Sequence, residues 1–223
     1  MQSIDYLNSQ YKIIQDSELY RFTSDSVLLS KFVVAHRGEV VADFCAGGGV
    51  VGLNFFACNT GVASVAFFEA QQELADLCTQ SVALNGLQDK MQVHCMRLQE
   101  IPAEYVEKFS LILCNPPFES GGFENADPKK APCRKELSLT LTELIESAKR
   151  CLKFGGRFAL CHRADRSAEV IASLHAAGLE PKRIQFVSGK RGREPYLVLI
   201  SAKKGAKCGV KVLSEIVNQG DGT

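Results

Sequence analysis

The chain has 223 residues, with 46% apolar and 23% charged side chains and a net charge of +1. This composition is that of an ordinary soluble globular domain, long enough to bury a full core. No run of about eighteen apolar residues is present, which excludes a transmembrane helix, and the N-terminus lacks the basic and apolar regions of a signal peptide.

Short apolar runs alternate with helix-like segments along the chain, a pattern typical of a mostly parallel sheet with helices on both faces. In chain order we expect strands and helices at 40–45 (strand), 47–58 (helix), 63–69 (strand), 71–86 (helix), 91–96 (strand), 109–114 (strand), 137–152 (helix), 157–162 (strand) and 165–177 (helix). A polar loop is expected at 119–136. The last two strands, 183–188 and 196–201, have a short link, which predicts an antiparallel hairpin at the sheet edge.

These elements predict an α/β fold with a seven-stranded, mostly parallel sheet. The domain is expected to span 37–204. An N-terminal segment, 1–36, is expected to cover its cleft, and a basic tail, 205–223, to follow it.

A glycine-rich turn, in the stretch DFCAGGGVVGL, follows the first strand and opens a helix. Gly47, Gly49 and Gly52 satisfy G-x-G-x-x-G, which fits NAD or S-adenosylmethionine because glycines let a ligand approach the backbone. Glu69 ends the next strand, where a carboxylate can accept hydrogen bonds from ribose hydroxyls. Asp43 precedes the turn, and a carboxylate there suits a cationic sulfonium or ammonium better than a pyrophosphate. The motif therefore favours S-adenosylmethionine.

The stretch LILCNPPFES ends a buried strand abruptly, because two prolines can neither join a sheet ladder nor continue a helix. Ligands gather at the carboxyl ends of strands in such sheets, so Asn115 should lie near Asp43 and Glu69. The side-chain oxygen of Asn115 and the carbonyl of Pro116 can each accept one hydrogen of a planar exocyclic amine, which aims its lone pair at a methyl sulfonium. Phe118 offers a face on which an extruded base can stack.

Together, Asp-x-x-x-Gly-x-Gly, the distal Glu and Asn-Pro-Pro-Phe resemble the class I S-adenosylmethionine-dependent methyltransferases that modify planar nitrogens. The stretches YRFTSDSVLLSKF, CRKEL and GLEPKRIQFVSGKRGREPYLVLISAKKGAK resemble those of the bacterial valine-tRNA adenine-N6 methyltransferases, which modify an adenine beside the anticodon. This resemblance covers nearly the whole chain. It implies a Rossmann-like fold, S-adenosylmethionine as cofactor, and methylation of the N6 amine of an adenine in tRNA.

The resemblance also implies roles for individual residues. Those implied to bind the cofactor are Asp43, Gly47, Gly49, Glu69, Leu98 and Asn115. Those implied for catalysis are Asn115, Pro116 and Phe118, while Phe22 and Asp25 would close over the cofactor or substrate and Phe118 would stack on the target base. Such families often carry an acid after the third strand to bind the adenine of the cofactor. Arg97 and Leu98 stand there instead, which leaves backbone contacts, Gln99 or Glu100 for that task.

A basic segment over 181–211 carries nine Lys or Arg and a single acid, a net +8 that leaves −7 for the rest of the chain. Charge alone fits either a solvated surface or binding of a polyanion. With the methyltransferase resemblance, we expect its tip, Lys190, Arg191 and Arg193, to contact RNA phosphates. We also expect the protein to act as a monomer.

Nine cysteines are scattered through the chain, none in a C-x-x-C pair, and most fall within apolar strand or helix patterns. Scattered buried thiols favour a reducing compartment, so we expect a cytoplasmic protein with no membrane partner. Their spacing and the four dispersed histidines do not match a zinc site, and we expect no metal.

Several alternatives share parts of the motif. Protein-glutamine N-methyltransferases use Asn-Pro-Pro with Tyr at the position of Phe118, and they carry a separate helical N-terminal domain. Guanine-N2 methyltransferases of ribosomal RNA also use Asn-Pro-Pro-Phe, often followed by His where this chain has Glu119. A small-molecule O-methyltransferase would need a base or metal for which no clear constellation is present. An RNA-binding protein with a vestigial cofactor fold would not need an intact Asp43, Glu69 and Asn115.

Overall fold

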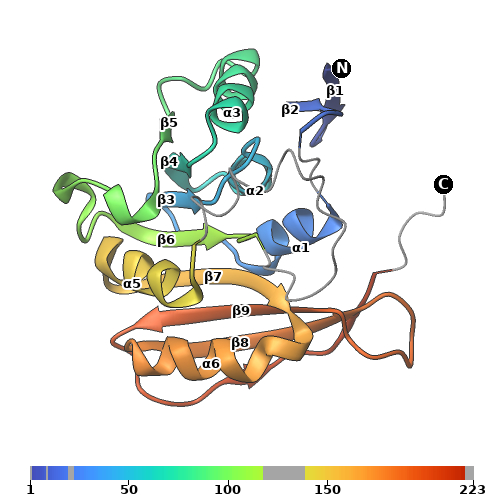
Figure 1. Cartoon of the computed structure of the whole chain (residues 1–223), viewed down its shortest axis with the longest axis vertical. Coiled ribbons are helices and arrows are strands. Elements are labelled where there is room, and N and C mark those ends of the chain that lie inside the picture. The colour runs from blue at the N-terminus through green and yellow to red at the C-terminus, as the bar shows by residue number, and fades with distance from the viewer. Residues whose placement is uncertain (1, 9, 20–22, 118–138, 219–223) are drawn as a thin grey trace, which may run out of the picture.

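The computed structural model describes residues 2–8, 10–19, 23–117 and 139–218, and it shows a twisted central sheet with helices on both faces (Figure 1). In these residues the central sheet comprises β3 (Glu39–Phe44), β4 (Val62–Glu69), β5 (Met91–Cys95), β6 (Phe109–Cys114), β7 (Leu152–Arg163), β8 (Leu179–Ser188), β9 (Leu197–Lys204), β10 (Lys211–Val212) and β11 (Ile216–Val217). The order is β10-β8-β9-β7-β6-β3-β4-β5, with β11 also paired to β8.

The strands β3 to β7 run parallel, and β9 lies antiparallel between β7 and β8. β3 and β6 read as near-continuous apolar runs because both of their faces are covered. The predicted fold class and the hairpin of the last two long strands are confirmed. The seven strands β3 to β9 overlap the seven predicted segments, and β10 and β11 add two short strands at the edge.

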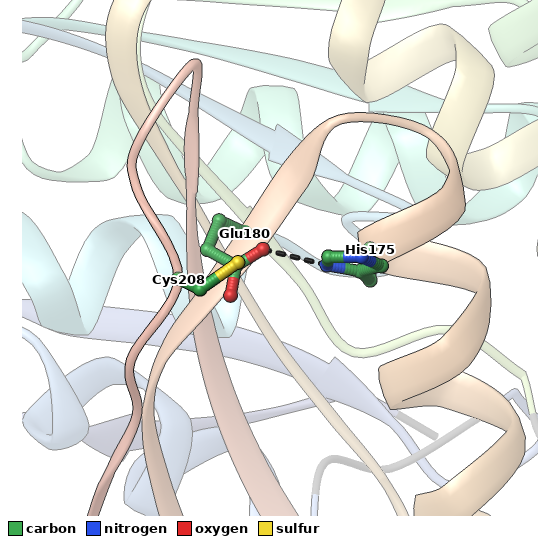
Figure 2. Close-up of side chains that lie close together, drawn as sticks. All are labelled: His175, Glu180 and Cys208. Carbon is green, nitrogen blue, oxygen red and sulfur yellow. Dashed lines mark hydrogen bonds and ion pairs between the residues drawn. The ribbon is translucent and has the colours of Figure 1, made fainter.

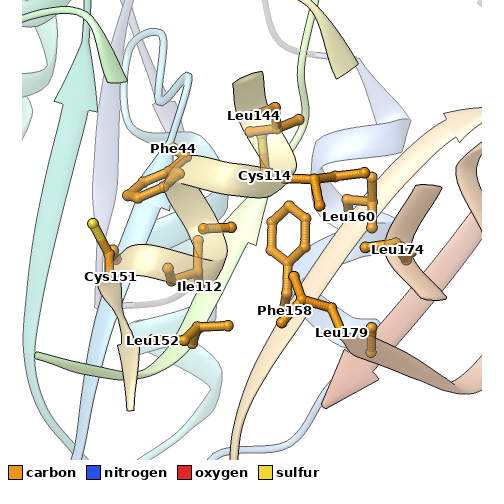
Figure 3. Packing of buried hydrophobic residues seen from close by; sticks show 14 of the residues in the cluster. Phe44, Ile112, Cys114, Leu144, Cys151, Leu152, Phe158, Leu160, Leu174 and Leu179 are labelled. Carbon is orange, nitrogen blue, oxygen red and sulfur yellow. The ribbon is translucent and has the colours of Figure 1, made fainter. Parts of the chain in front are cut away.

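The helices are α1 (Ser24–Phe32), α2 (Val50–Cys58), α3 (Gln72–Leu84), α5 (Leu141–Cys151) and α6 (Ser167–Ala176), with short 3-10 turns at Leu98–Glu100, Ala103–Tyr105 and Ala164–Arg166. One face of the sheet packs on α1, α2 and α3 through a first apolar cluster. The other face packs on α5 and α6 through a second cluster, which includes Phe44, Ile112, Leu144, Phe158 and Leu174 (Figure 3).

Several element boundaries differ from the predicted ones for local reasons. The helix expected from 137 begins at Leu141, because Thr140 and Glu143 form a reciprocal capping box that fixes its first turn. β7 begins at Leu152, not 157, and takes Gly155 and Gly156 into the strand through an irregular register against β6.

The N-terminal segment contains structure that the sequence pattern does not predict. β1 (Gln2–Tyr6) and β2 (Lys12–Asp16) form a separate antiparallel pair that packs against α3. The amide of Ile14 donates to Ser81 Oγ at 3.0 Å, and the amide of Lys12 donates to Asn85 Oδ1 at 2.9 Å. The pair is thereby fixed beside the helix that follows β4.

No helix in the described part of the chain is long and apolar enough to cross a membrane.

Candidate active site

The carboxyl ends of β3, β4 and β6 carry three of the predicted polar residues at one edge of the sheet. Asp43 and Glu69 stand at the ends of β3 and β4, and Asn115 directly follows β6. In-register pairing of Asp43 with Leu113 brings these strand ends level. Asp43, Glu69 and Asn115 therefore lie at the same edge of the sheet, as the sequence predicts.

The glycine turn is fastened to both carboxylates through backbone amides. The amide of Gly47 donates to Glu69 Oε2 at 2.8 Å, and the amide of Gly52 donates to Asp43 Oδ2 at 2.8 Å. Gly49 has φ +88°, and a Cβ there would lie 2.5 Å from Cys78 Sγ. Conformation and close packing thus both require glycine at that position.

Asp43 is fully buried, and its Oδ1 has no hydrogen-bond partner among the described residues. Burial raises the pKa of Asp43 well above its usual range, the Gly52 amide opposes this, and the charge of Glu69 adds to it. The carboxylate lies beneath the turn and orients it through the helix amide of Gly52.

The turn has the features needed to hold a nucleoside with an amino-acid tail. A Cβ added to Gly47 would project into open space, so a ligand can approach the backbone there. Glu69 accepts one hydrogen bond on each carboxylate oxygen, from the amides of Gly47 and Gln71, and each oxygen keeps a further lone pair for a hydroxyl donor. These residues fit S-adenosylmethionine.

Asn115 is held at both ends of its side-chain amide. Its Nδ2 donates to Ser26 Oγ of α1 at 2.9 Å, and its Oδ1 accepts from the thiol of Cys161 on β7 at 3.0 Å. Burial raises the pKa of Cys161 well above its usual range, which keeps the sulfur protonated as a donor. Pro116 is buried beside it, so the backbone that carries the amide is fixed as well.

The residues predicted to contact the adenine of the cofactor have different surroundings. Leu98 is only 5% exposed and packs in the core with Ile101 and Tyr105, so its side chain is not available for that role. Gln99 is hydrogen-bonded to Glu143 of α5, whose pKa is lowered first by its bonds from Thr140 and then by that from Gln99.

The basic loop 189–196 between β8 and β9 lies at the same edge as Asn115, because β8 runs parallel to β7. Lys190, Arg191 and Arg193 are exposed on it. At its end, the hydroxyl of Tyr196 donates to Asp25 Oδ1 of α1 at 3.3 Å. The loop is thus joined to the helix that supplies Ser26.

The remaining cations of the basic segment lie elsewhere, so it does not form one patch. Lys204 donates to Glu107 and to the carbonyls of Lys149 and Leu152, and Arg183 lies over the ring of Phe32. Phe22 and Phe118, which were predicted to contact the cofactor or substrate, are outside the described residues, as are the 119–136 loop and the CRKEL stretch.

Three residues of this region were not singled out by the sequence: Ser26, Cys161 and Tyr196. Cys161 becomes visible only through strand register, because Cys114 pairs with Leu160 and the next position of β7 therefore lies beside Asn115. Ser26 and Tyr196 reach the site from segments far away in the chain, for which no local pattern exists.

A parallel sheet with acids after two neighbouring strands, a glycine turn and Asn-Pro-Pro after a third defines a class I methyltransferase. The solved structures most similar in fold include a predicted O-methyltransferase of Agrobacterium tumefaciens (TM-score 0.70, 20% identity, 89% of each chain). TYW2 of P. horikoshii in complex with MeSAdo has a TM-score of 0.64 at 16% identity, over 92% of this chain and 72% of that one.

The chain belongs to the methyltransferase small domain family, whose profile matches residues 22–177. It is therefore an S-adenosylmethionine-dependent methyltransferase, as predicted. Among curated proteins, a relative from Tolumonas auensis is 24% identical over 86% of this chain and 79% of its own length. A relative from Flavobacterium psychrophilum is 23% identical over 81% and 77%. Both are named tRNA1(Val) (adenine(37)-N6)-methyltransferase.

Proposed function

We propose that this enzyme methylates the N6 amine of an adenine in tRNA, namely the adenine beside the anticodon of valine tRNA. We also propose that it acts in the cytoplasm as a monomer. The observation that carries the proposal is the fixed amide of Asn115 at the sheet edge that also presents the basic loop. The names of the curated relatives, which span most of this chain, support the choice of tRNA adenine.

Asn115 would orient the amine of the target base. Its Oδ1 has two lone pairs, of which the thiol of Cys161 takes one, and the second is available to a hydrogen of the amine. The carbonyl of Pro116 accepts the other hydrogen, which leaves the nitrogen lone pair directed away from both acceptors. No strong base is required, since the methylated ammonium loses its proton readily. Catalysis here is positioning and electrostatic stabilisation.

The glycine turn and the two carboxylates would hold the cofactor, which supplies the methyl group when bound. Glu69 offers its free lone pairs to ribose hydroxyls, and Gly47 leaves room for the ligand. Asp43 keeps Gly47 and Gly49 in place through its bond to Gly52. Phe118 and Phe22 are proposed to contact the substrate, as the resemblance implies, and the backbone of Leu98 the adenine of the cofactor.

The basic loop would contact phosphates of the RNA. Lys190, Arg191 and Arg193 are exposed at the edge where the target base must enter, and Asp25 with Tyr196 fixes the loop relative to α1. Such contacts add affinity that falls steeply with salt and carry little sequence information.

The test is transfer of labelled methyl groups to unmodified valine tRNA, followed by nucleoside analysis. We expect N6-methyladenosine with the wild type and loss of label with Asn115→Ala. Label on guanine, or on protein and not on tRNA, would overturn the proposed substrate.

The loop is tested by neutralising Lys190, Arg191 and Arg193 together. The matched control neutralises Lys203, Lys207 and Lys211, three exposed cations at or beyond the end of β9 and away from the loop. We expect weaker tRNA binding and a shallower salt dependence only for the loop variant. Equal effects of the two variants would refute a role for the loop.

A further inference from the structure

Three side chains of different chemistry converge at the edge of the sheet opposite the active site. His175 lies in the last turn of α6, Glu180 at the start of β8, and Cys208 between β9 and β10 (Figure 2). Their nitrogen, carboxylate and sulfur atoms all lie within 4.8 Å of one another. Sequence spacing gave no sign of this group, because Cys208 is 28 residues beyond Glu180 and joins it only through the fold.

These are ligand types of zinc. Zn²⁺ is bound by histidine nitrogen, cysteine sulfur and carboxylate oxygen, about 2.0–2.3 Å from the ion, so ligand atoms in a tetrahedral site lie roughly 3.3–3.8 Å apart. His175 Nδ1 and Glu180 Oε2 are 2.7 Å apart as a hydrogen-bonded pair and would separate slightly, while Cys208 would move inward. The thiolate and carboxylate offset both charges of the ion, and exposure of His175 and Cys208 leaves a fourth position to water.

Two hydrogen bonds bring the three segments close together independently of any ion. The amide of Gly178 donates to the carbonyl of His175 at 2.9 Å, which forms the turn from α6 into β8. The ammonium of Lys182 donates to the carbonyl of Lys207 at 3.0 Å, one residue before Cys208. The three ligands therefore lie near one another before any ion binds.

We propose that His175, Glu180 and Cys208 form a zinc site that fastens the C-terminal segment to β8. On binding, the thiol of Cys208 releases its proton to solvent, and the ion replaces the proton through which His175 Nδ1 is bonded to Glu180, so that neutral His175 then carries its ring proton on Nε2. From Cys208 the chain continues as β10 and β11 beside β8. It ends in the described region at Asn218, whose Nδ2 donates to Ser24 Oγ and to the hydroxyl of Tyr196, both at 2.9 Å.

The test uses the full chain, stripped with a chelator and then loaded with Co²⁺ or Zn²⁺. With Co²⁺ we expect a thiolate-to-cobalt charge-transfer band. With Zn²⁺ we expect the protein to compete with a chromophoric chelator for the ion. Cys208→Ser should abolish the band and lower zinc affinity at least about tenfold, and His175→Gln should lower that affinity by a similar factor. The controls are Cys58→Ser, another exposed thiol, and His36→Gln, from a second His–Glu pair without a thiol.

Hydrogen exchange measures the fastening directly. Added zinc should slow amide exchange across 205–218 in the wild type and not in Cys208→Ser. Absence of the charge-transfer band, or its persistence in Cys208→Ser, would overturn the site. Zinc binding without slower exchange would overturn its fastening role.

Discussion

Replacement of Cys161 by alanine removes one of the two hydrogen bonds that fix the Asn115 amide. The bond from the thiol to Oδ1 is 3.0 Å long, and Ser26 alone would then hold the side chain through Nδ2. A typical hydrogen bond contributes about 0.5–1.5 kcal/mol net, and loss of about 1 kcal/mol of positioning corresponds to roughly a fivefold lower kcat. KM for S-adenosylmethionine should stay unchanged, because the hydrogen bond from Cys161 goes to Asn115 and not to the glycine turn.

Three variants separate this role from a loss of packing. Cys161 is fully buried, so alanine there should also cost about 1 kcal/mol of unfolding free energy. Cys161→Ser restores a donor and should recover most of kcat, although a buried hydroxyl does not recover stability. Cys151→Ala removes an equally buried thiol from α5 and should lower stability while kcat stays at the wild-type value.

Steady-state methyl transfer, measured well below the unfolding temperature, and urea denaturation give the two quantities. If activity followed stability across the three variants, the thiol would be only a packing group. A kcat for Cys161→Ala within twofold of wild type would equally refute the positioning role.

Three further predictions follow from contacts near the sheet. Gly52→Ala should lower the free energy of unfolding in urea by about 1–3 kcal/mol, because the new Cβ would lie 2.5 Å from Phe67 Cε1; no loss would show that the helix shifts freely. Asp43→Asn should stabilise the protein at pH 7 in thermal unfolding, since the raised pKa of Asp43 means that its contribution to stability is present below about pH 4 and lost as the pH rises through the folded value. That advantage should shrink toward pH 4, and a pH-independent difference would contradict it. Arg157→Ala should destabilise by about 3–5 kcal/mol in urea, because it leaves the buried Glu39 carboxylate without its bonds of 2.7 and 2.9 Å; adding Glu39→Gln should restore part of the loss, and no restoration would refute the pairing argument.

The middle of the fold could be predicted from the sequence because its signals are local. β3, β4 and β6 are largely buried apolar runs, β5 is a shorter and more exposed strand, and the bounds of all four agree with prediction within about two residues. The N-terminal pair of strands has no comparable signal. In β2 only Ile13 is fully buried, and β1 alternates between exposed and half-buried residues. The position of β2 depends on α3, because its amides donate to Ser81 of that helix and to Asn85, which caps it.

The candidate site divides in the same way. Asn115, Asp43 and Glu69 stand at strand ends, so the rule that ligands gather at carboxyl ends places them together without coordinates. The partners of Asn115 are separated from it by 89 residues for Ser26 and 46 for Cys161. Their identity depends on strand register and on where α1 docks, and neither is encoded in a local pattern.

The basic segment shows why a run of charge in a sequence is not a surface patch. β8 and β9 are antiparallel, so the turn between them carries Lys190, Arg191 and Arg193 to the active-site edge. The cations at the start of β8 and the end of β9 lie at the opposite edge, where Lys204 caps the carbonyls at the end of α5 and Lys182 holds the segment before Cys208. The cations of this one segment therefore have two different roles. The turn is the part proposed to contact RNA, while Lys182 and Lys204 stabilise the fold by donating hydrogen bonds to loop and helix carbonyls.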